Sequence, residues 1–131
     1  MKIFGIGTDI VNIKRIDYSL KKHGFSFKNR IFSKKEISYC EKGKNPSAFY
    51  AKRFAAKEAF SKALGTGIRK GVNLKNIEIS NNVHGKPSIY LKGDLAAYLK
   101  KKVKYKKYDI HLSLSDDKPW AQATVIISYK K

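Results

Sequence analysis

The segment that most restricts the fold is a long helical stretch in the middle of the chain, SAFYAKRFAAKEAFSKALG, residues 47–65. At 100° per residue, apolar side chains gather on one side of this predicted helix: Phe49, Ala56, Phe60, Ala63 and Leu64. Glu58 falls on the opposite side, with Ser61 and Lys62 beside it. We therefore expect a domain built around this helix, with the Glu58 carboxylate outside the core.

The simplest interpretation of Glu58 is an exposed ion pair with Lys62 at i, i+4, contributing about 0.3 kcal/mol. Carboxylates are scarce here, however, because 29 Lys and Arg stand against 10 Asp and Glu, giving a net charge of +19. Such a charge attracts nucleic acid, anionic membrane, an acidic protein or a phosphate-rich small molecule. A general excess of lysine in the source proteome would produce the same surface, so the charge narrows the partners without choosing among them.

The rest of the chain predicts a small α+β domain. Its 131 residues and 42% hydrophobic content suit a single compact domain, residues 1–131. The patterns predict strands at 2–8, 76–80, 87–91, 109–115 and 121–129, and helices at 12–24, 33–41, 47–65 and 94–102. Ser33 and Glu36 fit a capping box, and Ser47 is a candidate cap for the long helix. This order favours a mostly antiparallel sheet around one long central helix.

The remaining sequence signals favour a cytoplasmic protein. The single Cys40 has no partner for an intramolecular disulfide. No apolar run reaches the roughly 18 residues of a membrane span. The N-terminal MKIFGIGTDIV starts like a signal peptide, but Asp9 interrupts its apolar stretch too early.

Two carboxylates are placed where chemistry is plausible. Asp9 follows the predicted first strand, just after GIGT, and Glu58 lies off the apolar face of the long helix. Mg²⁺ prefers oxygen ligands and often needs only one or two carboxylates plus substrate phosphates. The alternative for Asp9 is a residue favoured by the dipole at a helix N-terminus. A metal site and two structural carboxylates therefore both remain open at this point.

The residues after Glu58 suit phosphate. Ser61 and Lys62 lead into Gly65, Gly67 and Gly71, which surround Arg69 and Lys70, and such glycines allow close backbone approach to an anion. GTGIRKG lacks the ending of a P-loop and the last glycine of a dinucleotide motif, and Gly65 is also explained as a helix cap. The three histidines have no metal-binding spacing, and no GxSxG motif is present.

Two motifs carry a family resemblance. GIGTDIVNIKRI near the start and RFAAKEAFSKALGTGI in the middle resemble the holo-[acyl-carrier-protein] synthases of the 4′-phosphopantetheinyl transferase superfamily. NNVHGKPSIYL and DIHLSLSDDKPWAQATVII resemble the remaining blocks of that family, in the same order, so the resemblance covers almost the whole chain. It implies the 4′-phosphopantetheinyl transferase fold, assembled as a homotrimer with active sites between subunits.

The resemblance also implies a reaction and its residues. The 4′-phosphopantetheine arm of coenzyme A would pass to a serine of apo-acyl carrier protein in support of fatty acid biosynthesis, leaving adenosine 3′,5′-bisphosphate. Asp9 and Glu58 would bind Mg²⁺, with Lys62 as the third catalytic residue. Coenzyme A contacts are expected from these residues: Arg53, Ser61, Lys62, Gly65, Gly67, Lys86, Pro87, His111 and Ser113. A metal-bound water, Glu58 or Asp9 could each deprotonate the serine.

One position departs from the family pattern. Many relatives have His where this chain has Asp116, so no role is carried over to that residue. The basic residues of the first helix, Lys14, Arg15, Lys21 and Lys22, form a plausible docking face for an acidic carrier. The alternative function is a basic nucleic-acid-binding module without catalysis, for which Lys and Tyr in KKKVKYKKYD would contact phosphates and bases. Because that alternative leaves Asp9 and Glu58 unexplained, we do not expect nucleic acid as a partner. Since no apolar run is long enough to span a bilayer, we do not expect a membrane either.

Overall fold

The computed structural model describes residues 1–65 and 72–131. Within them the elements run β1 (Lys2–Asn12), α1 (Ile13–His23), α2 (Phe25–Ile31), α3 (Lys34–Glu41), α4 (Pro46–Leu64), a 3₁₀ turn (Leu74–Asn76), β2 (Ile77–Asn81), β3 (Pro87–Leu91), α5 (Leu95–Lys102), β4 (Tyr108–Asp117) and β5 (Trp120–Tyr129). Both sheets are antiparallel, which confirms the expected α+β class.

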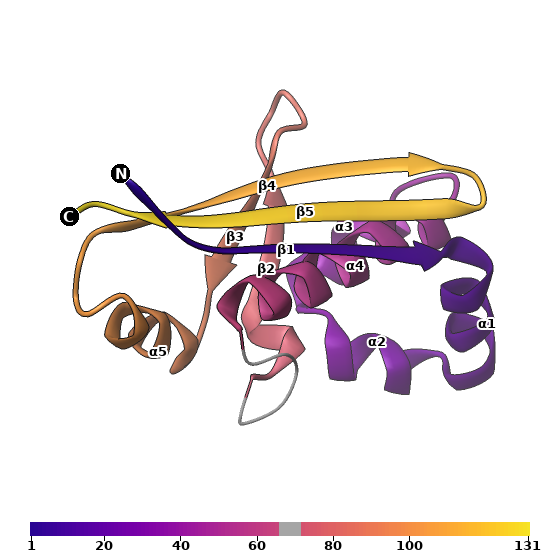
Figure 1. Ribbon diagram of the computed structural model, residues 1–131. Helices are drawn as coiled ribbons and strands as arrows, with labels where there is room; N and C mark the ends of the chain where they lie inside the picture. The colour runs from indigo at the N-terminus through magenta and orange to yellow at the C-terminus, as the bar shows by residue number, and fades with distance from the viewer. Residues whose placement is uncertain (66–71) are drawn as a thin grey trace.

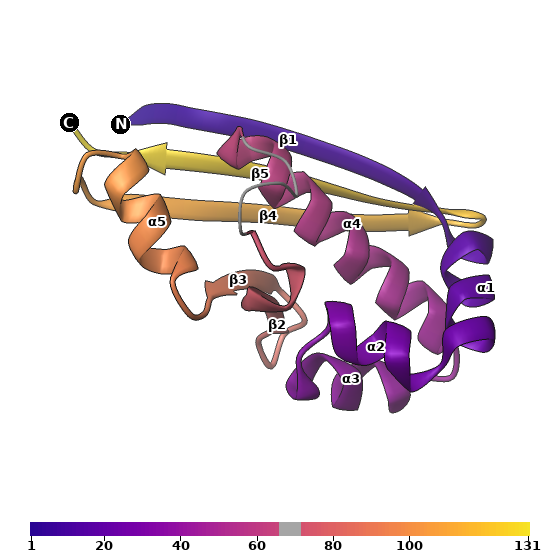
Figure 2. The ribbon, with the colours of Figure 1, turned by 90° about the horizontal axis from the view of Figure 1, so that it is seen from below.

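The main sheet has the order β1-β5-β4, and β2 and β3 form a separate hairpin. All helices lie on one side of the main sheet (Figure 1), and α4 crosses beneath it diagonally (Figure 2). On the covered face, Val11, Ala121, Ala123, Val125 and Ile127 are almost fully buried. The opposite face is open, because Ile6 and Ile10 of β1 are 63% and 62% exposed.

Helix α4 is more deeply buried than its apolar pattern predicts. Between residues 53 and 64 all positions are buried except Phe54, Glu58 and Lys62, each one turn after the last, and these three form a narrow exposed stripe. Ser61, grouped with Glu58 in the sequence, is instead fully buried, and its Oγ donates to the Lys57 carbonyl at 3.0 Å. Packing on both sides of the helix, against the sheet and against α3 and β2, accounts for the difference.

A buried ion pair connects α4 to α3 and β2. The Lys57 ammonium is fully buried and donates to Glu36 Oε1 at 2.8 Å, to the Leu74 carbonyl at 2.9 Å and to the Ile77 carbonyl at 2.5 Å. All three ammonium protons are thus used. Glu36 also accepts from the backbone N–H groups of Ser33 and Ile79. Burial lowers the pKa of Lys57, and the Glu36 carboxylate opposes that shift.

Most predicted elements are confirmed, with small shifts at their ends. The capping box at Ser33 and Glu36 has both of its hydrogen bonds. The first strand, however, continues to Asn12, because Ile10 and Val11 still pair with β5. Asp9 therefore lies within β1 and not at its end.

Two local predictions are wrong. Residues 25–31 form the short helix α2, which we did not predict; Gly24 both ends α1 and begins α2, with φ of 52°. The cap of α4 is Asn45, followed by Pro46 at the first helical position, where proline needs no N–H partner. Ser47 instead donates to Asp17 of α1 at 2.6 Å.

The buried ion pair predicts a large asymmetry between two lysines of α4. Lys57→Met leaves the Glu36 carboxylate buried without its cation, so we expect a loss of about 3–5 kcal/mol in the free energy of unfolding. Lys52→Met breaks the partly exposed Lys52–Asp116 pair, at 3.1 Å, and is the matched control. We expect it to lose no more than about 1 kcal/mol. Urea unfolding measures both; equal losses would contradict the assigned role of Lys57.

Candidate active site

The candidate site forms where β1 lies directly on the backbone of α4. A Cβ at Gly5 would sit 1.9 Å from the Ala63 carbonyl oxygen, and one at Gly7 would sit 1.9 Å from that of Ala59. No side chain fits either gap, so these two glycines let the strand approach the helix. Because strand side chains alternate, Asp9 extends from the same face as Gly7. The contact therefore directs Asp9 toward α4.

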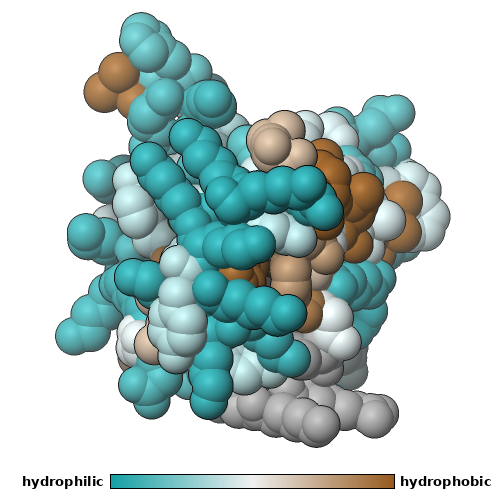
Figure 3. Space-filling view, turned by 60° about the vertical axis from the view of Figure 1, so that its left-hand side comes forward, coloured by the Kyte–Doolittle hydropathy of each residue, from teal (hydrophilic) through white to brown (hydrophobic). Residues whose placement is uncertain are grey.

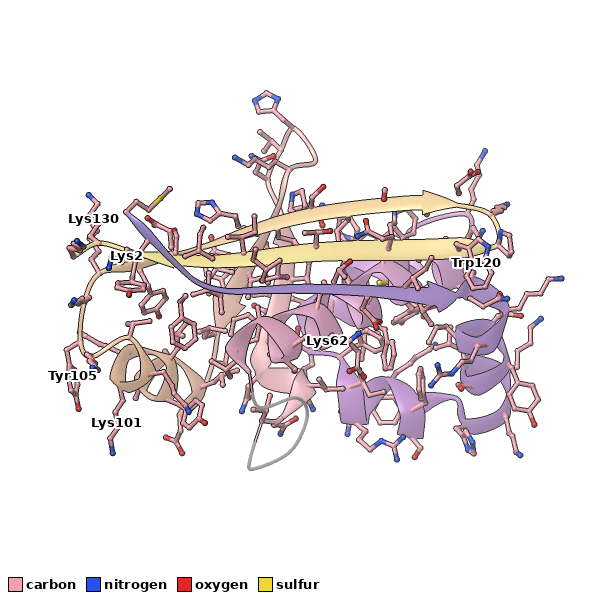
Figure 4. All side chains as sticks on the ribbon, viewed as in Figure 1. Lys2, Lys62, Lys101, Tyr105, Trp120 and Lys130 are labelled. Atoms are coloured by element: carbon pink, nitrogen blue, oxygen red, sulfur yellow. The ribbon has the colours of Figure 1, made fainter. Side chains whose placement is uncertain are left out.

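Lys62 and Glu58 meet Asp9 from the exposed stripe of α4. The Lys62 ammonium donates to Asp9 Oδ1 at 3.1 Å and to the Thr8 carbonyl at 3.0 Å. Figure 4 shows Lys62 at the edge of α4 beneath the sheet. The Asp9 side chain is 18% exposed and that of Lys62 is 54% exposed, so ligands can reach the cluster from solvent.

The electrostatics of the cluster favour an added cation. Burial raises the pKa of Glu58, and the neighbouring Asp9 charge raises it further. Lys62 and Arg15 oppose these effects. Arg15, assigned above only to carrier docking, thus also affects the protonation of Glu58. Two carboxylates close enough to raise the pKa of one of them are a suitable ligand set for a hard cation.

The two carboxylates fit Mg²⁺ in a particular way. Across residues 1–65 and 72–131, no group of three or more His, Cys, Asp or Glu side chains could hold a metal ion. Asp9 and Glu58 would supply two carboxylates, a set that suits Mg²⁺ because this ion commonly takes one or two carboxylates together with several waters and substrate phosphates.

A second group of predicted residues lies around Arg53. This side chain is 2% exposed, lies 4.2 Å over the Tyr39 ring and donates to Asn81 Oδ1. It borders a cavity of about 90 Å³ whose other lining residues are Lys35, Tyr39, Glu78, Ile79, Ser80 and Asn81. Asn81 pairs with Pro87 across the β2–β3 hairpin, and Lys86 is the exposed residue before it. Arg53, Lys86 and Pro87 thus belong to one region.

Sequence reasoning missed Lys35, Tyr39 and Asn81 in this region. Their positions follow from how α3 and β2 pack against α4, and no motif near them signals it. The Arg53 Nε is buried and has no hydrogen-bond partner among the described residues.

The structure does not bring His111 and Ser113 to either group. Both side chains are exposed on the open face of the sheet, opposite α4, while Ile110, Leu112 and Leu114 face the helix. His111 Nε2 lies 3.0 Å from Ser128 Oγ. Gly65 ends α4 with φ of 88°, and Gly67 lies outside the described residues.

The four residues predicted for carrier docking all lie on α1. Lys14, Arg15, Lys21 and Lys22 are exposed, and a hollow of about 470 Å³ is lined by Lys14, Asp17, Tyr18, Lys21 and Lys22. Lys21 pairs with Asp17 at 2.9 Å.

Comparisons with known proteins agree with these observations. The model of the 4′-phosphopantetheinyl transferase superfamily matches residues 5–123. A holo-[acyl-carrier-protein] synthase of Pelagibacter ubique is 46% identical over 130 residues, covering 99% of this chain and 100% of that one. The crystal structure of the Neisseria meningitidis synthase has a TM-score of 0.87 at 40% identity, covering 96% of this chain and 98% of that one.

The structure of a third relative contains a bound ligand. The Helicobacter pylori holo-[acyl-carrier-protein] synthase was solved with coenzyme A; it has a TM-score of 0.78 at 36% identity, covering 94% of this chain and 99% of that one. The chain belongs to the 4′-phosphopantetheinyl transferase superfamily. It is a transferase of that family, and the resemblance of its motifs to the holo-[acyl-carrier-protein] synthases is confirmed.

The two perturbed carboxylates predict opposite effects of charge removal. Because the pKa of Glu58 is raised in the folded protein, the fold is more stable when this group is protonated. That contribution to stability is lost as pH rises through the folded pKa. Near pH 7, Glu58→Gln should therefore leave the Tm unchanged or raise it. Hydrogen bonds from Lys28 and Tyr50 lower the pKa of Glu41, so Glu41→Gln should lower the Tm. Thermal unfolding in metal-free buffer measures both, and a lower Tm for Glu58→Gln would contradict this view of the site.

Proposed function

We propose that this chain transfers the 4′-phosphopantetheine arm of coenzyme A to a serine of apo-acyl carrier protein, with Mg²⁺ bound by Asp9 and Glu58. The observation that carries the proposal is the convergence of Asp9, Glu58 and Lys62 at the β1–α4 contact, in a member of this family. We further propose that the reaction takes place in the cytoplasm and supports fatty acid biosynthesis.

The proposed reaction is a phosphoryl-type transfer. The serine oxygen forms a bond to the phosphorus that carries the pantetheine arm, and the diphosphate P–O bond breaks. The leaving group is adenosine 3′,5′-bisphosphate, whose 5′-phosphate is the other half of the diphosphate. The hydroxyl proton passes to a site carboxylate or to water. Bound Mg²⁺ would supply charge neutralisation and polarisation at the diphosphate. Such transfers need alignment and electrostatic stabilisation more than covalent help from the protein.

Each residue of the site then has a distinct task. Asp9 and Glu58 supply anionic oxygens for the cation. Lys62, whose ammonium now lies on Asp9 and the Thr8 carbonyl, supplies a positive charge for the leaving phosphate. Ser61 is fully buried and its hydroxyl donates to the Lys57 carbonyl, so of the glycine and serine predicted here only Gly65, one turn later at the helix end, is assigned a contact with coenzyme A.

The nucleotide half of coenzyme A has a candidate region of its own. The buried guanidinium of Arg53 and the nearby Lys86 offer positive charge for a phosphate, and Pro87 offers an apolar surface. We propose that Gly67 completes the contacts from its position after α4.

The open face of the sheet supports a shared site. Ile6 and Ile10 of β1 expose apolar surface there, and His111 and Ser113 of β4 are exposed on the same face, with β5 between the two strands. Because His111 and Ser113 point away from the site of their own chain, they can contribute only to the site of another subunit. We therefore propose a homotrimer in which this face is covered and these two residues contact the coenzyme A of a neighbour.

Carrier docking is proposed for the basic face of α1. Arg15 of this face lies near the Asp9–Glu58 cluster, since its charge acts to lower the pKa of Glu58. An acidic carrier guided to Lys14, Lys21 and Lys22 would thus arrive with its serine near the metal site.

Mass spectrometry of an apo-acyl carrier protein incubated with this protein, coenzyme A and Mg²⁺ tests the reaction. We expect the carrier to gain one phosphopantetheine.

Glu58→Gln should lower kcat/KM at limiting Mg²⁺ by at least about 100-fold, the effect of several kcal/mol of lost transition-state stabilisation. Glu41→Gln is the matched control and should retain its rate. Unmodified carrier with the wild-type protein would refute the reaction, and full turnover by Glu58→Gln would refute the metal assignment.

Assembly gives a separate prediction. Ile6→Glu places a charge on the open sheet face, so we expect it to convert the trimer to a monomer and to abolish transfer activity. Phe25→Glu, at a similarly exposed apolar residue on α2, should leave the trimer intact. Size-exclusion chromatography with light scattering measures the oligomeric state. An active, stable monomer would rule out the shared site.

A further inference from the structure

A dense cluster of lysines lies at the end of the molecule opposite α1. Six of the eight residues at positions 100–107 are lysine, and residues 95–108 contain no Asp, Glu or Arg. Figure 4 places Lys101 and Tyr105 at the same end as Lys2 and Lys130, far from Trp120 at the other end. Figure 3 shows this end, where hydrophilic side chains cover most of the surface. We call Lys100, Lys101, Lys102, Lys104, Lys106, Lys107 and Tyr105 the lysine end.

Several contacts show that these lysines converge with the sheet. The Lys130 N–H donates to the Lys107 carbonyl at 2.9 Å, which ties the end of β5 to the segment before β4. Lys102, Lys104 and Lys106 line a hollow of about 250 Å³ together with Phe4, Val103 and Tyr129. The hollow is large enough to receive a phosphate headgroup.

The positive charge of the lysine end is not neutralised within the fold. Every ion pair found in residues 1–65 and 72–131 uses a lysine from elsewhere: Lys21, Lys28, Lys52, Lys57, Lys62 and Lys92. Residues 66–71 contain no carboxylate that could change this. Clustered like charges repel one another, so an anionic partner would relieve the repulsion.

The backbone singles out Tyr105 within the lysine end. Lys104 and Tyr105 have φ of 55° and 63°, in the left-handed region where glycine is favoured. Tyr105 nevertheless carries a side chain that is 69% exposed and contributes little to the core. A large aromatic residue kept in a strained and exposed position points to a use of that side chain at the surface.

We propose that the lysine end binds the surface of an anionic membrane, with Tyr105 in the headgroup region. Clustered lysines at the end of an amphipathic helix such as α5 suit an anionic lipid surface, and tyrosine is enriched at that interface. This proposal revises our expectation that no membrane is involved, and it concerns peripheral binding. Among residues 1–65 and 72–131, none of the helices has both the length and the apolar character needed to cross a bilayer.

Single-stranded nucleic acid fits the lysine end less well. Base stacking needs open aromatic faces. Here the Lys102 ammonium lies over the Tyr98 ring and the Lys106 ammonium over the Tyr129 ring, each 5.5 Å from the ring centroid, so Tyr105 is the open ring at the lysine end and successive bases would lack a second one beside it. Arginine, which matches phosphate in a bidentate manner, is absent from residues 95–108. A lipid headgroup layer requires neither feature.

Membrane binding through this end would leave the chemistry free. In Figures 1 and 2, α5 and α1 lie at opposite ends of the sheet. An acidic carrier could therefore reach α1 and the Asp9–Glu58 cluster while the lysine end contacts lipid.

Co-sedimentation with lipid vesicles tests the proposal on the full chain. We expect binding to phosphatidylcholine vesicles that contain about one third phosphatidylglycerol, and none to pure phosphatidylcholine. In the variant Lys101→Gln/Lys104→Gln/Lys106→Gln, the partition coefficient between vesicle and water should fall about 100-fold. Each lysine removed should account for about a fivefold loss, and the three losses multiply. The control Lys34→Gln/Lys42→Gln/Lys118→Gln removes the same charge from exposed lysines elsewhere and should change binding by less than about threefold.

Tyr105→Gly separates binding from folding. Because glycine relieves the left-handed backbone, we expect an unchanged or higher Tm together with several-fold weaker vesicle binding. Three outcomes would overturn the proposal: no binding to anionic vesicles, an equal loss in both triple variants, or tighter binding to a single-stranded RNA oligonucleotide than to vesicles at equal phosphate concentration. The last outcome would assign the lysine end to nucleic acid.

Discussion

The direct contact of β1 with the backbone of α4 is the constraint on which the site depends. Gly5 and Gly7 lie against the carbonyl groups of Ala63 and Ala59, where even one methyl group has no space. This approach brings the next residue on the same face, Asp9, within hydrogen-bond distance of Lys62. A bulkier strand would move Asp9 away from the helix and separate the two carboxylates. The glycines of GIGT therefore act through packing, and they need not touch any ligand.

The other side of α4 is stabilised by a buried ion pair and its hydrogen bonds. There Lys57 and Glu36 form a fully buried ion pair whose hydrogen bonds reach α3, β2 and the turn before β2. The same contacts place β2 beside Arg53, and so they also shape the cavity at Asn81. The regions proposed for the diphosphate and for the nucleotide thus lie on opposite sides of one helix, the first supported by glycine packing and the second by buried charge.

Sequence reasoning reached the fold class and most elements because their signals are local. The capping box at Ser33 and the apolar periodicity of α4 depend on neighbours within a few residues. Sequence reasoning missed the features that depend on contacts between residues far apart in the sequence. Helix α2 is only seven residues long and begins at a glycine that also ends α1. Ser61 looked exposed because its helix was assumed to have one apolar face, and the burial of Lys57 is visible only once α3 and β2 are in place. His111 and Ser113 belong to a motif, but only the sheet shows that they face away from α4.

Lys57 and Glu58 are adjacent in sequence yet have opposite surroundings, and this determines how α4 is rolled about its own axis. An α-helix turns 100° per residue, so Lys57 at the centre of the protein leaves Glu58 beside solvent. The six alanines of α4 lie on several sides of the helix and constrain its roll angle less than the fully buried rings of Tyr50 and Phe60 do. Rolling the helix by one residue would bury the charge of Glu58 without a cation and expose Lys57. Buried charge therefore acts together with the glycine contacts at Ala59 and Ala63 to fix one roll angle for the helix.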